Sequence, residues 1–360
     1  MGLRDEILEQ PVVAAWLLGP GRAAIDSIAD AIAGRIANRE LDTVVIAARG
    51  SSDHAAVYAQ YLFGARLRLP VALATPSLTS LYGVELRLDR SLVIGISQSG
   101  RSPDIVGAIA AARRQNAPTI AMTNSPISEL AIASEHVIDL GAGEELAVAA
   151  TKTYTAELLS VALLVIAIEG RLDRGSEVTA VTTDDMESAL TAVPDAIAAA
   201  LGTEAEAEAV AGHLAGQDRL VVVGRGFEYA TARELALKLK ELAQVAADPY
   251  SAADFLHGPL ALVSAGFPLI AIAPSGPTAA DVDALLDRLG ELDVDLIVVS
   301  DRPEAVARGS IGIMFPARLP EWLRPIATIV PGQLLGLHLA IARGLDPETP
   351  RWIRKVTLTS

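Results

Sequence analysis

Short apolar runs alternate with longer amphipathic stretches along most of the chain. Runs such as LVIGI at 92–96 are apolar throughout, which is typical of strands buried on both faces of a parallel sheet. In the first half, the pattern predicts strands near 43–48, 70–74, 92–97, 118–122 and 136–139, and helices near 53–66, 102–115 and 152–169. In the second half, it predicts strands near 219–223, 268–273, 295–299 and 311–314, and helices near 228–244, 278–290 and 332–343.

The two halves of the chain repeat one pattern at an offset of about 176 positions. Three segments match: 93–102 with 269–278, 44–50 with 220–226, and 119–126 with 296–303. Matches at a nearly constant offset indicate duplication, and strand–helix alternation is typical of doubly wound sheets. We therefore predict an α/β fold built of two tandem doubly wound parallel-sheet domains related by internal duplication.

The domain boundaries follow from the repeat and from the acidic, alanine-rich stretch between its copies. The predicted parts are a helical segment at 1–36, a first domain at 37–175, a helical linker at 176–205, a second domain at 206–345 and a tail at 346–360.

Composition narrows the class of protein. A net charge of −15 argues against a nucleic-acid partner, which would require a basic face. The absence of cysteine excludes disulfides and thiolate metal ligands and fits a cytoplasmic location. The five histidines have no metal-ligand spacing, so we expect no metal. The charged N-terminus does not resemble a signal peptide, and apolar runs such as 161–168 are too short to span a bilayer, so we expect no membrane partner.

A hydroxyl-rich loop follows the predicted strand at 92–97. A loop between a parallel strand and a helix offers unpaired backbone N–H groups and the positive end of the helix dipole. Ser97, Ser99 and Ser102 add hydroxyl donors, and Gly100 allows the backbone to close around an anion. These residues predict a phosphate cradle, and the alternative is a turn that only caps the following helix. In the second half, Ala273 and Pro274 replace Ser97 and Gln98, so the hydroxyl cradle belongs to the first half alone.

The second half instead carries an ionisable cluster. Glu234, Lys238 and Glu241 are spaced i, i+4 and i+7, which places them on one face of a predicted helix. Spacing alone favours a solvated salt-bridge stripe over a catalytic face. His257, between leucines at the start of a loop, is by itself more typical of a structural histidine than of a catalytic one.

Several long motifs resemble one family. They are ISQSGRSPD at 96–104, ELAVAATKTYTAEL at 145–158, ALKLKELAQVAADPYSAADFLHGPLAL at 236–262 and DPETPRWIRKVTL at 346–358. Together they are similar to the isomerase part of glucosamine-6-phosphate synthase, which is a tandem pair of sugar-isomerase (SIS) domains of flavodoxin-like fold. The resemblance covers essentially the whole chain. It implies a sugar 6-phosphate as the small-molecule partner, no cofactor, and a homodimer with a shared active site.

The resemblance also implies roles for individual residues. The carboxylate that moves a proton between C1 and C2 corresponds to Glu241, and the lysine that stabilises the developing oxyanion corresponds to Lys238. A ring-opening histidine donated by the neighbouring subunit corresponds to His257, and the C-terminal lysine near the carbonyl carbon corresponds to Lys355. The implied phosphate and sugar contacts are Ser52, Ser97, Gln98, Ser99, Ser102, Glu145 and Val148. With these roles the face at 234–241 is interpreted as catalytic, because one carboxylate can serve both proton transfers.

The direction of the reaction is the last expectation. Full synthases carry an N-terminal glutaminase domain that begins with a cysteine, and this sequence begins at the isomerase part and has no cysteine. We therefore expect a deaminase that converts glucosamine 6-phosphate and water to fructose 6-phosphate and ammonia. The alternatives are a deglycase of fructosamine 6-phosphates, left open by departures from the family at Arg49, Asp254 and Leu256, and a non-catalytic sugar-phosphate sensor. Retention of Glu241, His257 and Lys355 together argues against the sensor.

Overall fold

The computed structural model describes residues 2–172, 183–316 and 319–355. The parts of the predicted linker at 176–182 and of the predicted tail at 356–360 lie outside the described residues. The chain divides into two compact units, each with one sheet. The first-sheet unit comprises Val12–Glu145, Lys152–Thr191 and the chain from Arg354, and the second-sheet unit comprises the chain up to Pro11, Leu146–Thr151 and Ala192–Ile353.

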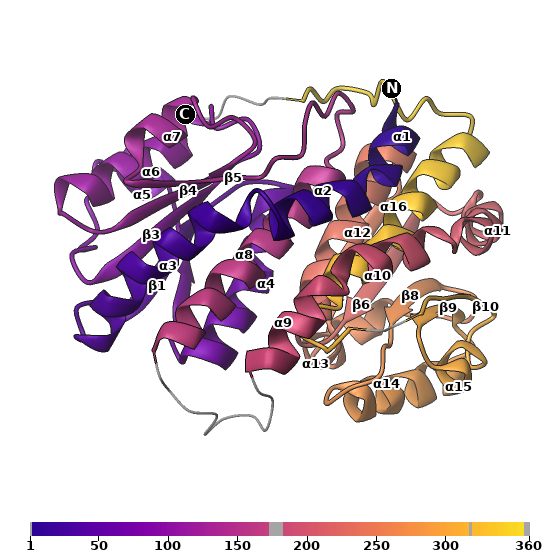
Figure 1. Cartoon of the computed structure of the whole chain (residues 1–360). Coiled ribbons are helices and arrows are strands. Elements are labelled where there is room, and N and C mark those ends of the chain that lie inside the picture. Colours follow the sequence, from indigo (N-terminus) through magenta and orange to yellow (C-terminus); the bar gives the residue numbers. More distant parts are fainter. Residues whose placement is uncertain (1, 173–182, 317–318, 356–360) are drawn as a thin grey trace. The chain divides into compact units, whose positions relative to one another are not determined.

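The first sheet has the order β2-β1-β3-β4-β5, and all its strand pairs are parallel. Its strands are β1 (Thr43–Ala47), β2 (Val71–Leu73), β3 (Ser91–Ile96), β4 (Thr119–Thr123) and β5 (His136–Asp139). Helices lie on both faces, with α6 and α7 on one side and α4 and α8 on the other (Figure 1). The helices from residue 10 through this unit are α2 (Gln10–Leu18), α3 (Arg22–Ala37), α4 (Ser51–Leu62), the π-helical turn η1 (Phe63–Leu67), α5 (Ser77–Ser80), α6 (Pro103–Arg114), α7 (Glu129–Ala133), α8 (Lys152–Arg171) and α9 (Thr183–Thr191).

The second sheet repeats this topology with the order β10-β9-β8-β6-β7, again wholly parallel. Its strands are β6 (Arg219–Gly224), β7 (Ala246–Ser251), β8 (Pro268–Ile272), β9 (Asp295–Ser300) and β10 (Ile311–Met314). Its helices are α1 (Leu3–Leu8), α10 (Val193–Leu201), α11 (Glu204–Leu214), α12 (Glu228–Ala243), α13 (Ala252–Leu256), the 3₁₀ turn η2 (Pro259–Leu262), α14 (Ala279–Glu291), α15 (Pro303–Val306) and α16 (Pro325–Ala342). The predicted fold class is confirmed.

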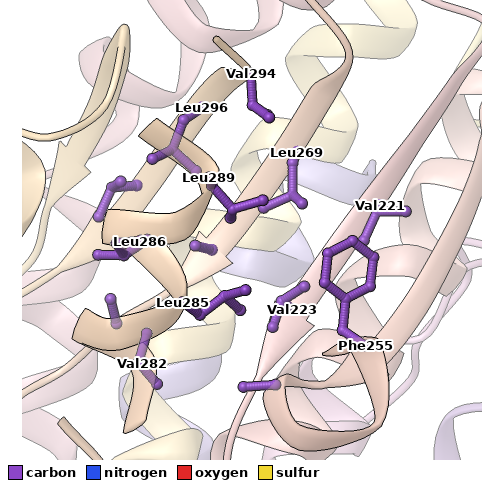
Figure 2. Close-up of a cluster of buried hydrophobic side chains, with 14 of the residues drawn as sticks. Val221, Val223, Phe255, Leu269, Val282, Leu285, Leu286, Leu289, Val294 and Leu296 are labelled. Atoms are coloured by element: carbon purple, nitrogen blue, oxygen red, sulfur yellow. The ribbon is translucent and has the colours of Figure 1, made fainter. Parts of the chain in front are cut away.

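A cluster of buried side chains fixes α14 to the second sheet (Figure 2). Leu285 and Leu289 of α14 pack toward Leu269 of β8 and Leu296 of β9, and Phe255 of α13 covers Val223 of β6. Burial of this apolar face provides most of the free energy that holds helix to sheet. The arrangement leaves the carboxyl ends of the strands to the loops.

The sequence prediction omitted the short helices α5, α7, α13 and α15, and it also differs from the structure at two longer elements. β7 was not predicted, because its sequence AADPYS contains a proline; it lies at the sheet edge, where the missing N–H of Pro249 is tolerated. α16 begins at Pro325 rather than near 332, because Pro331 lies inside the helix instead of marking its start.

Two helices are longer and more apolar than the sequence runs indicated. α8 and α16 are each long enough to cross a bilayer, and each contains an 18-residue window with a mean hydropathy of 1.5. The bent helix pair Leu3–Leu18 and Arg22–Ala37 would be a third candidate if it formed one span. The short uninterrupted apolar runs of the sequence, such as 161–168, therefore lie within longer apolar helices. However, 89% of the α8 window and 83% of the α16 window are buried inside the protein, so core packing accounts for their apolar character.

Gly224, at the end of β6, provides a test of this packing. A Cβ on Gly224 would collide with the backbone carbonyl of Glu228 in the first turn of α12. We expect Gly224→Ala to lower the free energy of unfolding by about 1–3 kcal/mol, since a backbone atom cannot move away as a side chain can. Urea denaturation measures this, with Gly212→Ala on an open part of α11 as the control. An unchanged midpoint for Gly224→Ala would contradict the packing.

Candidate active site

In each sheet the first strand in the chain lies between the second and third strands. The connections that leave the first and third strands therefore run to opposite faces, and a crevice forms where they diverge. In the first sheet this crevice is bounded by the loop 48–50 after β1 and the loop 97–102 after β3. The predicted phosphate cradle thus lies where open α/β sheets bind ligands.

The loop 97–102 closes tightly on itself. The Gly100 N–H donates to the Ser97 carbonyl at 3.1 Å and lies 3.2 Å from Ser97 Oγ. Gly100 has a φ of +63°, and a Cβ there would collide with the Ser128 hydroxyl. The Asn124 N–H binds the Gln98 carbonyl at 3.1 Å and fixes the loop to the end of β4. The glycine requirement predicted for this position is therefore both conformational and steric.

The hydroxyl groups of the cradle differ in their partners. Ser102 is the N-cap residue of α6 but makes no side-chain capping hydrogen bond, so its hydroxyl is not used as the capping alternative supposes. Ser97 is buried, whereas Gln98, Ser99 and Ser102 are half-buried. Ser52, in the first turn of α4, donates to Glu157 Oε1 of α8 at 2.7 Å. In this geometry the Ser52 hydroxyl donates its hydrogen bond to Glu157 and not to a ligand.

The first-sheet unit also brings together Glu145 and Lys355, which are 210 positions apart in the chain. Lys355 Nζ lies 2.5 Å from Glu145 Oε2, and the Glu145 side chain is fully buried. The same carboxylate accepts hydrogen bonds from the Thr153 N–H at 3.2 Å and the Thr153 hydroxyl at 2.8 Å, which joins it to the first turn of α8. Glu145 therefore holds the C-terminal lysine against the loop that precedes α8.

In the second-sheet unit, α12 carries the ionisable cluster that the spacing predicted on one face. Lys238 Nζ lies 2.6 Å from Glu241 Oε2 and 3.3 Å from Glu234 Oε1. The side chains of Lys238 and Glu234 have no exposed area, while 22% of Glu241 is exposed. The interpretation as a solvated stripe is therefore wrong for two of the three groups, and only Glu241 of the three reaches the surface.

Burial by itself lowers the pKa of Lys238 and is the largest single effect on it. The carboxylates of Glu234 and Glu241 together outweigh burial and raise that pKa above its ordinary value, so Lys238 is a permanent cation. Gly336 of α16 packs directly over Lys238, since a Cβ at that glycine would lie 3.4 Å from Lys238 Cβ. Lys238 thus fixes Glu241 from beneath, and its predicted contact with a substrate oxyanion stays a prediction.

The two remaining predicted residues lie in the same unit. His257 is exposed and follows α13, where its N–H donates to the Asp254 carbonyl at 3.1 Å. Val148 is half-buried in the segment 146–151. That segment is anchored by Glu6 of α1, a buried carboxylate that accepts from the N–H groups of Leu146 and Ala147. No sequence pattern indicated this role for Glu6, because its nearer partner is a backbone group 140 positions away.

The second sheet has an equivalent crevice, but a carboxylate of the protein closes it. Asp301, after β9, accepts from the Ser275 N–H at 2.6 Å and from the Ser275 hydroxyl at 2.5 Å. In the first copy the matching residue is the neutral Asn124, whose amide binds the backbone of Ala142 and Gly143 instead. The loop of the second copy that corresponds to the predicted cradle is therefore occupied by Asp301. Among the described residues, no group of three or more His, Asp or Glu side chains is arranged to hold a metal ion.

A buried glutamate lies beside this second crevice. Glu228 begins α12 and accepts from Thr231 Oγ1 at 2.6 Å and Thr328 Oγ1 at 3.0 Å. Burial raises the pKa of Glu228 to about 7, although both hydroxyls and the nearby Arg324 favour its ionised form. The sequence offered no signal for this burial.

The comparisons with known proteins agree with this architecture. A SIS domain model matches residues 39–167 and 213–342, so the chain belongs to the SIS domain family and carries two copies of the domain. It is 34% identical over 351 residues to the glutamine–fructose-6-phosphate aminotransferase (isomerizing) of Thermococcus kodakarensis, covering 97% of this chain and 56% of that protein. The chain thus spans little more than half the length of this relative.

Solved structures share the arrangement. The C-terminal domain of glucosamine-fructose-6-phosphate aminotransferase from Francisella tularensis has a TM-score of 0.84 at 25% identity and covers 96% of both chains. A glucosamine-6-phosphate deaminase from Thermotoga maritima has a TM-score of 0.69 at 21% identity, over 96% of this chain and 100% of that one, which shows a common fold.

The buried cluster on α12 predicts a large effect of removing its cation. We expect Lys238→Met to lower the free energy of unfolding by about 3–5 kcal/mol, because the Glu234 carboxylate is left buried without its partner. Denaturant unfolding measures this, with the exposed Lys240→Met on the same helix as the control. Adding Glu234→Gln to Lys238→Met should recover part of the loss. A Lys238→Met protein as stable as the control would contradict the geometry.

Glu228 predicts a pH dependence of stability. Its folded pKa of about 7 lies above its ordinary value of 4.5, so the folded state holds the proton more tightly and its contribution to stability falls as pH rises from about 4.5 to 7. We therefore expect Glu228→Gln to raise the melting temperature relative to wild type at pH 8 and to change it little at pH 5. The exposed Glu208→Gln is the control. An equal effect at both pH values would exclude a buried titration.

Proposed function

We propose that this protein converts a sugar phosphate by proton transfer between C1 and C2, and that its reaction is the deamination of glucosamine 6-phosphate to fructose 6-phosphate and ammonia. The observation that carries the proposal is the state of Glu241. It is the exposed member of a cluster whose other two side chains are buried, and a permanent cation holds it at 2.6 Å. A fixed, accessible carboxylate is the group that this proton transfer needs.

The chemistry follows from these groups. Once the sugar ring is open, Glu241 removes the proton from one of the two carbons and returns it to the other through a cis-enol intermediate. For glucosamine 6-phosphate, transfer from C2 to C1 gives an imine at C2, and water hydrolyses this imine to the ketone and ammonia. His257 is exposed, and imidazole is the side chain that most often transfers protons in enzymes, so we assign it to ring opening. Lys355, held by Glu145, is assigned to the sugar carbonyl end.

The phosphate of the substrate is assigned to the loop 97–102. Its backbone donors lie at the start of α6, its glycine is conformationally required, and its Ser102 hydroxyl is not used for capping. Binding energy gained at the phosphate is remote from the reacting carbons and can serve to position them. The equivalent loop in the second copy is closed by Asp301, so we assign one phosphate site to each chain.

One relative suggests the reaction that this deamination would reverse. It is 34% identical to this chain and is named for amino transfer to fructose 6-phosphate with isomerisation. Amino transfer to the C2 carbonyl of that ketose gives an amino sugar with nitrogen at C2. The same proton transfer run backward on that product, with water as the second reactant, releases ammonia.

The test is ammonia release from glucosamine 6-phosphate by the purified protein. We expect Glu241→Gln to lower kcat by about 10²–10⁴-fold, because the proton carrier is removed, and to leave binding of the substrate within a few fold. We expect Ser99→Ala to raise KM. The matched control is Ser275→Ala, the same position in the duplicated loop that Asp301 closes, and it should leave both constants unchanged.

Other outcomes distinguish the alternatives. Lysine release from fructoselysine 6-phosphate, with no ammonia from a hexosamine phosphate, would make the protein a deglycase. Interconversion of aldose and ketose phosphates alone would make it an isomerase without deaminase activity. Tight binding of these compounds without turnover of any would show a sensor and contradict the assignment of Glu241.

A further inference from the structure

An arginine at the cradle crevice has no role in the proposed reaction so far. Arg49 is the second residue after β1, so it borders the crevice opposite the hydroxyl loop. Its Nε lies 2.9 Å and its Nη2 2.8 Å from Oδ2 of Asp104, in the first turn of α6. The pair therefore spans the two connections that form the switch point, and Arg49 lies beside the start of α6 where the anion is expected.

The two partners differ sharply in exposure. The Asp104 side chain is 2% exposed, and its other oxygen accepts from the Ile105 N–H at 2.9 Å. Arg49 is 49% exposed, and within the described ranges its Nη1 makes no hydrogen bond. Asp104 thus fixes one edge of a planar guanidinium and leaves the opposite edge toward solvent at the crevice. Arginine in this state is suited to hold a phosphate oxygen.

The second copy has a similar arginine–aspartate pair at the equivalent position, so the two pairs can be compared. Arg225 is the matching residue after β6, and its Nε lies 3.1 Å from Oδ2 of Asp281 in the first turn of α14. There the carboxylate is 61% exposed, and Asp301 already occupies the adjacent loop. An Arg–Asp bridge is therefore common to both crevices. Among the described residues, the first copy alone combines this bridge with a buried aspartate and with a loop to which no protein carboxylate is hydrogen-bonded.

We propose that Arg49 is a phosphate-binding residue of the first crevice and that Asp104 is its positioning residue. This inference rests on the proposed phosphate site. A protein of net charge −15 repels anions at long range, so its cradle requires donors that point at the phosphate from close range. Arg49 supplies guanidinium donors of this kind, and the loop 97–102 supplies the remaining hydrogen bonds. The ligand it recognises is the phosphate ester group, whichever sugar carries it.

The experiment is calorimetric titration of inorganic phosphate and of glucosamine 6-phosphate into wild type, Arg49→Gln, Arg49→Lys and Arg225→Gln. To prevent turnover, the glucosamine 6-phosphate series also carries Glu241→Gln. We expect Arg49→Gln to raise the dissociation constants of both ligands at least tenfold and Arg49→Lys to raise them less. The dissociation constants of Arg225→Gln should stay within twofold of those of wild type. The melting temperatures of all variants establish whether they are folded. If Arg49→Gln does not fold, the comparison of Arg49→Lys with wild type is the test.

The outcomes separate this inference from the proposed function. Arg49→Gln or Arg49→Lys binding phosphate as tightly as wild type would overturn the role of Arg49, even if the protein releases ammonia. Loss of affinity in Arg49→Gln alone supports the role, even if no ammonia is released and the deaminase proposal fails. Equal losses in Arg49→Gln and Arg225→Gln would show a structural bridge and overturn it. A wild-type protein that binds neither ligand would overturn both proposals.

Discussion

The position of the first strand between the second and third governs both halves of this protein. In a parallel sheet every connection must cross a face, and the order of strands decides which face. The connections after β1 and β3 separate to opposite faces, and so do those after β6 and β8. Each separation opens a crevice whose walls are a loop and the start of a helix. The cradle, its arginine and the closed loop of the second copy all result from this one constraint.

Duplication gave the chain two such crevices, and small changes made them different. The first copy has the neutral Asn124 where the second has Asp301. The carboxylate of Asp301 accepts hydrogen bonds from the N–H and hydroxyl of Ser275, so an anionic group of the protein itself occupies that loop. Replacement of Ser97 and Gln98 by Ala273 and Pro274 removes donors from the same loop.

Most of the fold could be predicted, because parallel strands buried on both faces are continuous apolar runs. The missed strand β7 shows the limit of that signal, since Pro249 and Asp248 break its apolar pattern. The repeat nevertheless contained it: the predicted strand at 70–74, moved by 176 positions, falls on 246–250. Spacing likewise placed Glu234, Lys238 and Glu241 on one face. It could not show that two of them are buried, because their burial depends on α16, whose Gly336 packs over Lys238 from 98 positions further along the chain (336 − 238).

The partners of the site residues were less accessible to sequence reasoning than the residues themselves. Asp104 and Glu145 of the first-sheet unit and Glu234 of the second-sheet unit are buried carboxylates, and each holds one cation: Arg49, Lys355 and Lys238, respectively. A carboxylate that is out of water holds its cation in one orientation, so little conformational entropy is lost when a ligand binds. It also cancels the charge, so such a site recognises an anion by the direction of its donors more than by net potential. In the proposed phosphate site, such donors would allow a chain of net charge −15 to bind an anion without a basic surface.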